Sequence, residues 1–192
     1  MHASKSTIVL LIIFVISWLL YACTNKNHQI GDTIDHFEGV AVYYNGSVSH
    51  VDGRNLAPDG YNLGLKYQCV EFVKRFYYEA LNHKMPNSYG HAKDFYQNDL
   101  ADGRLNADRN LLQFSNPSIE KPKVYDLVVF DATTFNPYGH VAIVSKVDED
   151  ALEIIQQNPG RLAKSRMVYN LKKTDNLWRI EHSGVLGWLR ME

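Results

Sequence analysis

The chain has 192 residues, of which 45% are hydrophobic and 21% are charged, and its formal net charge is −1. These values are typical of a single globular domain that is long enough to bury its own core. The balanced charge gives no electrostatic basis for binding nucleic acid or an anionic membrane surface, and two cysteines cannot form a disulfide framework.

The N-terminal segment differs in composition from the rest of the chain. Residues 7–22 are almost wholly apolar, one lysine precedes them, and Cys23 begins a polar stretch. This pattern predicts a secretory signal over residues 1–23. The four residues that end at Cys23 resemble a bacterial lipobox, in which the cysteine is lipidated. The alternatives are an uncleaved membrane anchor and a cleaved secreted protein, and all three place the rest of the chain outside the cytoplasm.

The remaining chain is expected to hold a tether at 24–38 and one domain at 39–192, with elements that change in kind along it. Its first half predicts a strand at 40–44, a loop at 45–64, a helix from Cys69 to about Asn82, a turn at 86–89, a second helix at 92–100 and a loop at 101–123. Its second half predicts strands at 126–131, 140–147, 152–157, 167–171 and 185–190. This order indicates an α+β fold, with N-terminal helices packed on a C-terminal antiparallel sheet.

Cys69 is the one candidate nucleophile of this domain. It follows a glycine-rich loop at 59–64 and opens the segment whose apolar residues recur at helical spacing. A thiol in the first turn of a helix lies near the positive end of the helix dipole, which favours the thiolate and lowers the pKa. The alternative is a buried free thiol that acts as a small hydrophobic residue.

A nucleophilic thiol needs a base, and His140 is the best placed of the eight histidines. It follows Gly139 and begins a strongly apolar strand, so rigid backbone holds a ring that remains reachable. Strands 140–147 and 151–157 are expected to form a hairpin in which His140 faces Asn158 and Val147 faces Ala151.

In that hairpin Gln156 and Asn158 share the face of His140. An amide oxygen that accepts a hydrogen bond from imidazole Nδ1 would fix the tautomer and leave Nε2 toward sulfur. A register slip of one residue would bring Gln157 there in place of Gln156.

Other catalytic motifs are missing from the sequence. There is no C-x-x-C, H-x-x-x-H or H-E-x-x-H spacing for a metal, and no G-x-S-x-G, phosphate loop or G-x-G-x-x-G. We therefore expect no metal and no cofactor.

At five segments the chain resembles the CHAP family, the cysteine, histidine-dependent amidohydrolases/peptidases, and most closely the amidase domain of glutathionylspermidine synthetase/amidase. These segments are 39–43, 64–72, 139–144, 155–158 and 186–188. The resemblance implies a papain-like fold, with Cys69 as nucleophile and His140 as general base and acid. The third residue of the family is a glutamate, and Gln156 stands at that position here. A neutral glutamine can orient the imidazole but cannot stabilise an imidazolium as a carboxylate does.

The leading hypothesis is an exported thiol amidohydrolase that cleaves amide bonds in peptidoglycan peptides. Backbone N–H groups at the start of the Cys69 helix, together with Gln68 and with support from Asn158, would hold the oxyanion. A second hypothesis is release of a polyamine from glutathione, for which Glu71, Asp94 and Asp131 are candidate acidic groups. A third is a lipid-anchored binding module that has lost activity because of Gln156.

Overall fold

The computed structural model describes residues 28–160 and 164–192. The expected signal and lipidation site, Cys23 included, lie outside the described residues. Within the described part of the chain, no helix is both long enough and apolar enough to cross a membrane.

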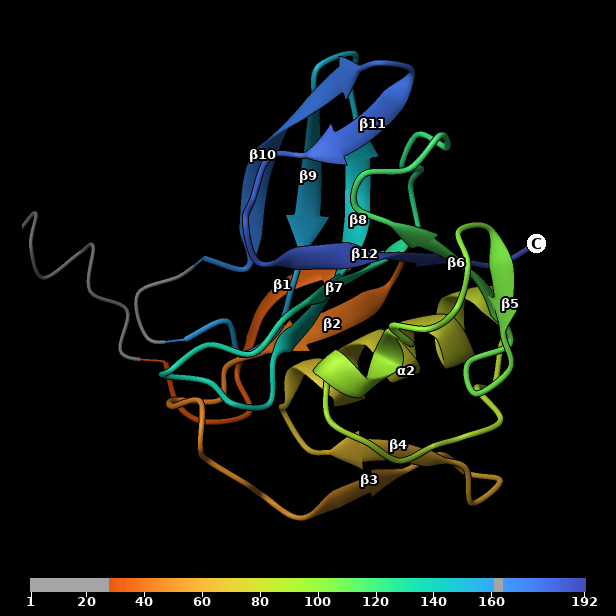
Figure 1. Ribbon diagram of the computed structural model, residues 1–192. Coiled ribbons are helices and arrows are strands. Elements are labelled where there is room, and N and C mark those ends of the chain that lie inside the picture. The colour runs from red at the N-terminus through yellow and green to blue at the C-terminus, as the bar shows by residue number, and fades with distance from the viewer. Residues whose placement is uncertain (1–27, 161–163) are drawn as a thin grey trace, which may run out of the picture.

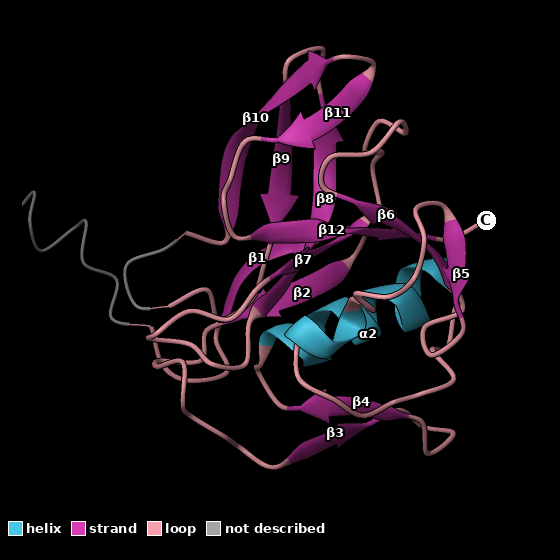
Figure 2. Cartoon of the chain, in the orientation of Figure 1, coloured by secondary structure: helices cyan, strands magenta, loops and turns pink. Residues whose placement is uncertain are grey.

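Most of the domain is one eight-stranded antiparallel sheet with the strand order β11-β10-β9-β8-β7-β12-β6-β5 (Figure 1, Figure 2). The strands are β5 (Arg104–Asn106), β6 (Leu111–Ser115), β7 (Leu127–Phe130), β8 (His140–Val147), β9 (Ala151–Ile155), β10 (Arg166–Thr174), β11 (Leu177–Ile180) and β12 (Val185–Arg190). A bridge between Ser118 and Trp178 ties β11 to the chain that follows β6. The sheet therefore curls toward itself.

The helix α2 (Cys69–Leu81) lies between this sheet and a small hairpin, β3 (Arg54–Leu56) and β4 (Asn62–Leu65) (Figure 1). A second hairpin pairs β1 (Thr33–Phe37) with β2 (Val40–Tyr43), and β2 also contacts α2. Residues 33–37, expected to lie in the tether, thus form a strand. The other helical segment described is a short 3₁₀ turn, η1 (Lys93–Phe95).

The bounds of α2 follow from its sequence. Gln68 has extended backbone angles, and the apolar side chains that follow at helical spacing are buried. Asn82 adopts the left-handed conformation that often ends a helix, because asparagine tolerates it better than most residues. The predicted helix from Cys69 is therefore confirmed at both ends.

Two apolar layers stabilise the fold, one on each face of the sheet. The first joins α2 to the sheet through side chains such as Phe72, Phe76 and Ile143. The second fills the inside of the curl with side chains such as Trp188 and Ile154. Burial of these two layers removes much apolar surface from water, which is the dominant favourable contribution to folding.

The expectation of N-terminal helices packed on a sheet is wrong. The described residues hold one α-helix, and strands extend through both halves of the chain. Residues 45–64 and 101–123, expected as loops, each contain two strands, β3 with β4 and β5 with β6. These strands have only three to five residues each and lack a clear alternating pattern, so no local signal predicts them.

The second predicted helix, at 92–100, is also wrong, since only residues 93–95 are helical and Tyr96 is already extended. A buried side chain explains why. Gln113 accepts a hydrogen bond from the Gln97 backbone N–H and donates one to the Gln97 carbonyl, at 2.9 and 2.8 Å. The backbone at 97 is thus paired by a residue sixteen positions away rather than by a helical turn.

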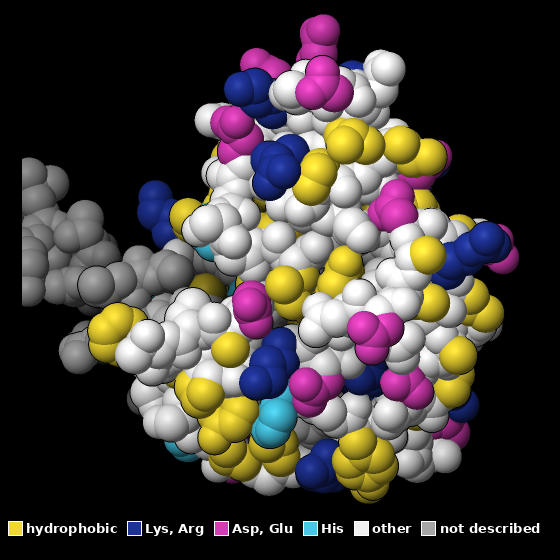
Figure 3. Space-filling view, viewed as in Figure 1, with side chains coloured by type: hydrophobic (Ala, Val, Ile, Leu, Met, Phe, Trp, Pro, Cys, Tyr) yellow, Lys and Arg dark blue, Asp and Glu magenta, His cyan; other side chains and the backbone are white. Residues whose placement is uncertain are grey.

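Charged side chains of both signs are mixed on one face of the molecule. Figure 3 shows lysine or arginine interspersed with aspartate or glutamate on the face that it draws, with apolar side chains between them. This mixture agrees with the formal net charge of −1.

Candidate active site

Cys69 begins α2, and its sulfur lies against the start of β8. The backbone N–H groups of Val141, Val70 and Cys69 lie near enough to the sulfur to favour the thiolate. Burial has the larger and opposite effect and raises the pKa of the thiol to about 11. The lowered pKa expected from the helix dipole is therefore wrong, although the N–H groups act in the expected direction.

His140 is the first residue of β8 and directly precedes Val141, and its ring is held by Gln156. His140 Nε2 lies 3.0 Å from Gln156 Oε1. The other end of the same amide, Gln156 Nε2, donates to the Lys164 carbonyl at 2.9 Å, which fixes Oε1 toward the ring. The oxygen accepts from Nε2–H, so Nδ1 carries the lone pair. The expected tautomer carried its proton on Nδ1, which was to donate to the amide oxygen. In the structure the donor is Nε2–H, and Nδ1 is the free acceptor.

Burial also lowers the pKa of His140 to about 4, and the hydrogen bond to Gln156 opposes this shift only in part. The imidazole is therefore neutral at pH 7, and so is the Cys69 thiol. Both groups therefore rest in their neutral forms rather than as a thiolate and an imidazolium.

A bulge in the β8–β9 hairpin determines how Gln156 reaches His140. Near the turn Val147 pairs with Leu152 rather than with Ala151 as expected. A register shift between Val144 and Lys146 then changes the pairing, so that Ile143 pairs with Ile155. This is the register expected for the His140 end of the hairpin. It puts Gln156 diagonally across from His140.

Gln68 and Asn158 contact each other, not the imidazole. Asn158 Nδ2 donates to Gln68 Oε1 at 2.8 Å, and Gln68 Nε2 donates to the carbonyls of His50 and Val48 at 2.6 and 3.2 Å. The Gln68 amide is therefore committed to the 48–50 loop, and the N–H groups at the start of α2 are the available oxyanion donors. Both side chains hold the helix start in place.

A buried ion pair one turn into α2 has a structural importance that was not predicted from the sequence. Glu71 and Arg75 are buried and their charged groups lie 2.6 Å apart. Glu71 also accepts hydrogen bonds from Asn55 and from Gln157, at 2.8 Å each. Opposite charges four residues apart on a helix were the available signal. Since Glu71 is fully paired, it is not the free acidic group that polyamine recognition would need.

Two glycines let the surrounding chain approach the site closely. A Cβ on Gly64 would lie 3.2 Å from the backbone of Glu71, and one on Gly139 would lie 2.6 Å from the Phe130 carbonyl oxygen. Both residues also have positive φ angles, of 131° and 73°. Each glycine precedes a candidate catalytic residue, Gly64 by five positions and Gly139 directly.

A polar pocket of about 310 Å³ opens near the end of β7. Phe130 pairs with His140, and the next residue, Asp131, lines the pocket with Asp94 and Lys93. Asp94 and Asp131, proposed from sequence as candidate acidic groups, are thus brought to one pocket. No group of three or more potential metal ligands occurs within residues 28–160 and 164–192.

Comparison with known proteins gives matches to one domain family and to two curated relatives. The CHAP domain matches residues 59–158, slightly more than half of the chain. Trypanothione synthetase of Crithidia fasciculata is 26% identical over 145 residues, which are 73% of this chain and 22% of that protein. Glutathionylspermidine synthase of the same organism is 33% identical over 104 residues, which are 51% of this chain and 14% of that protein. The chain therefore spans less than a quarter of either relative.

Two solved structures of Ly7917 also match. One, with the hydrolyzing product of MDP, is 30% identical over 39% of this chain and 30% of that chain, with a TM-score of 0.27. The other is 19% identical over 65% of this chain and 53% of that chain, with a TM-score of 0.38. Likenesses at these TM-scores support no statement about fold or substrate.

Proposed function

Because the chain belongs to the CHAP domain family, a family of amidohydrolases and peptidases, we propose that it hydrolyses amide bonds with Cys69 as nucleophile and His140 as base. The observation that carries this proposal is the arrangement at the start of β8. The Val141 N–H lies near the Cys69 sulfur and favours its thiolate, and the adjacent His140 is held by Gln156 in the tautomer that leaves Nδ1 as an acceptor.

The reaction begins from the neutral pair. Nδ1 of His140 takes the thiol proton as sulfur attacks the carbonyl carbon, and the carbonyl π electrons move to oxygen. The N–H groups of Cys69 and Val70, which have no helical carbonyl to bond, stabilise that oxyanion. The protonated Nδ1 then gives its proton to the leaving amine, and the C–N bond breaks to leave a thioester on Cys69.

Hydrolysis of the thioester repeats the proton transfers with water. Nδ1 removes a proton from the water that attacks the thioester carbon, and the C–S bond breaks. The proton returns to sulfur and a carboxylic acid leaves. Gln156 holds Nε2–H throughout, so the ring cannot rotate to the wrong nitrogen.

The substrate class follows from the compartment that we propose. The apolar segment at 7–22 and Cys23 support export and a lipid anchor, which would bring the domain to the cell wall. On this basis the scissile bond is an amide of peptidoglycan peptides, or the amide that attaches them to sugar.

A second candidate is cleavage of a glutathionyl–polyamine amide, which the pocket at the end of β7 favours. Asp94 and Asp131 supply two carboxylates that attract a protonated amine, although Lys93 offsets one of these charges. One of the chain's relatives is named as a glutathionylspermidine synthase, and this chain covers 14% of that protein.

The purified full chain should be incubated with soluble peptidoglycan fragments and, separately, with glutathionylspermidine, and the products identified by mass spectrometry. We expect muropeptide cleavage by the wild type and none by Cys69→Ala. Release of spermidine with no change in the muropeptides would overturn the cell-wall proposal. In that case Asp131→Asn should raise KM for glutathionylspermidine, whereas Asp175→Asn, in the β10–β11 turn, should not. Failure to cleave either substrate would favour a binding module.

A further inference from the structure

We propose that the ion pair between Asp35 of β1 and Arg166 of β10 is a positioning device for Gln156 and, through it, for the tautomer of His140. This inference rests on the function proposed for that site. It assigns a role to β1, a strand that lies before the segments of family resemblance and outside the residues matched to the CHAP domain.

Gln156 is positioned mainly by the two residues that precede β10. Its backbone N–H donates to the Ser165 carbonyl at 2.8 Å, and its side-chain Nε2 donates to the Lys164 carbonyl at 2.9 Å. The third bond, from His140 Nε2 to its Oε1, depends on the orientation that the other two impose. A shift of residues 164–165 therefore changes which atom of the amide faces the imidazole.

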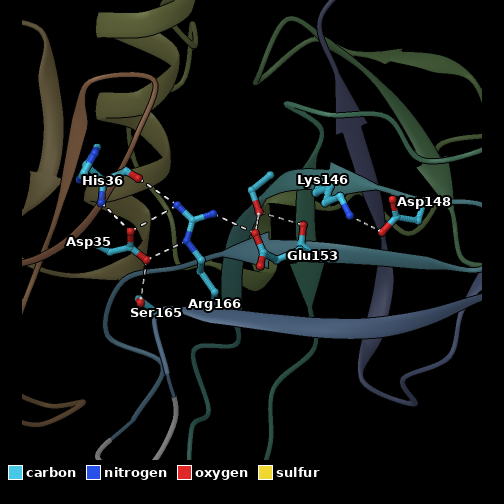
Figure 4. A network of polar contacts seen from close by, with 8 residues as sticks. Asp35, His36, Lys146, Asp148, Glu153, Ser165 and Arg166 are labelled. Atoms are coloured by element: carbon cyan, nitrogen blue, oxygen red, sulfur yellow. Dashed lines mark hydrogen bonds and ion pairs between the residues drawn. The ribbon is translucent and has the colours of Figure 1, made fainter.

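Asp35 holds these two residues from the other side (Figure 4). One carboxylate oxygen, Oδ2, accepts from Ser165 Oγ at 2.8 Å and from Arg166 Nε at 2.9 Å. Arg166 also donates to Oδ1 at 3.3 Å and to the His36 carbonyl at 2.9 Å. The carboxylate thus fixes both the side chain of Ser165 and the first residue of β10.

The arginine is in turn fixed to the sheet. Arg166 Nη1 donates to Glu153 Oε1 at 2.8 Å (Figure 4). Ser145 Oγ donates to the same oxygen at 2.8 Å. Ser145 lies at the bulge that sets the register of Gln156 with His140. The network therefore spans the three strands that determine where Gln156 lies.

The charge state of Asp35 suits this role. Burial alone would raise the pKa of its carboxyl, but hydrogen bonds from Arg166, Ser165 and the His36 backbone lower it overall. Asp35 is therefore ionised at neutral pH and holds Arg166 through a charged, bidentate contact, which is stronger and more directional than a neutral one.

The test compares full-chain Asp35→Asn with wild type by the ¹⁵N chemical shifts of the His140 ring, which report the tautomer. We expect predominantly Nε2–H in the wild type and a mixture in Asp35→Asn. We also expect kcat to fall about 10-fold with little change in KM, short of the 10²-fold that a full misplacement can cost. Asp35→Glu, which keeps the carboxylate, should recover part of the wild-type tautomer population and part of the wild-type kcat.

Lys172→Gln is the matched control, because it breaks a 4.0 Å surface ion pair with Glu181 that lies outside this network. It should leave the shifts and kcat at wild-type values. A folded Asp35→Asn with wild-type shifts and kcat would overturn the inference. If Asp35→Asn does not fold, Ser165→Ala replaces it, because this variant keeps the ion pair but removes the Ser165 bond to Asp35. Wild-type ring shifts and kcat in a folded Ser165→Ala would then overturn the inference.

The two proposals can fail separately. A tautomer that changes in Asp35→Asn, in a chain that hydrolyses no amide, would reject the proposed function and keep the positioning role. Hydrolysis by the wild type, with an unchanged tautomer in Asp35→Asn, would keep the proposed function and reject the positioning role.

Discussion

At the scale of single residues, burial decides the resting state of the candidate catalytic pair. It raises the pKa of Cys69 to about 11 and lowers that of His140 to about 4, so neither group is charged at pH 7. A carboxylate at position 156 would oppose the second shift, but Gln156 offers only a hydrogen bond. We infer that proton transfer accompanies attack and does not precede it.

The alkylation rate of Cys69 tests this resting state. With a thiol pKa of about 11, roughly 0.1% of the sulfur is thiolate at pH 8, so the rate with iodoacetamide should rise steadily from pH 6 to pH 10. His140→Ala should slow alkylation below pH 8, and replacement of the exposed His91 by alanine should not. A rate that is already at its plateau at pH 6 would show a preformed thiolate and contradict the inference.

Replacement of Gln156 by glutamate tests why an amide stands at this position. The new carboxylate should raise the pKa of His140, because an opposite charge favours the imidazolium. It also loses the hydrogen bond to the Lys164 carbonyl and places a carboxylate oxygen against that carbonyl oxygen. This change should cost about 1–3 kcal/mol of stability. Titration of His140 by NMR and urea unfolding measure the two effects. An unchanged pKa would refute this account of Gln156.

At the scale of elements, the sequence allowed correct prediction where a segment has a strong apolar pattern of its own. The helix from Cys69 and the strand from His140 have clear apolar patterns, and both are confirmed. The segment at 92–100 could not be predicted correctly, because its backbone is paired by Gln113, which no local pattern reveals. Gln156 was found as a neighbour of His140 even though the bulge in β8, which moves the turn end by one residue, was not foreseen.

The buried pair of α2 gives a prediction at this scale. Arg75→Met leaves the Glu71 carboxylate buried without its cation, and we expect a loss of about 3–5 kcal/mol in the free energy of unfolding. Lys172→Met, which breaks a 4.0 Å pair with Glu181 on the surface, should cost less than about 1 kcal/mol. Urea unfolding compares the two variants, and equal losses would show that the α2 pair has no special structural role.

At the scale of the whole molecule, α2 is held on two sides, by the curled sheet and by the β3–β4 hairpin. The side toward the hairpin contains an unusual group, the buried Lys74. Its ammonium donates to the carbonyls of Asn62 and Ser88 and lies 4.7 Å from the ring centroid of Tyr61. Burial, with the nearby positive charges of Arg109 and Arg54, lowers its pKa from 10.5 to about 7.

Lys74 should make stability depend on pH. Between about pH 7 and pH 10.5 the unfolded chain binds a proton at this lysine that the folded chain does not. The free energy of unfolding therefore rises with pH across that window, and the unfavourable contribution of Lys74 is at its full value below it. Lys74→Met should be more stable than wild type at pH 6, and the difference should shrink toward pH 10. A constant difference in urea unfolding would contradict the lowered pKa.

The central claim is that the chain is an amidohydrolase whose nucleophile is Cys69. Mass spectrometry of peptidoglycan digests treated with wild type or with Cys69→Ala tests it most directly. We predict new muropeptides that carry a free amine and a free carboxyl group in the wild-type digest, each pair differing from its parent by one added water. The Cys69→Ala digest should match the untreated one. The same cleavage products from Cys69→Ala as from the wild type would contradict the claim.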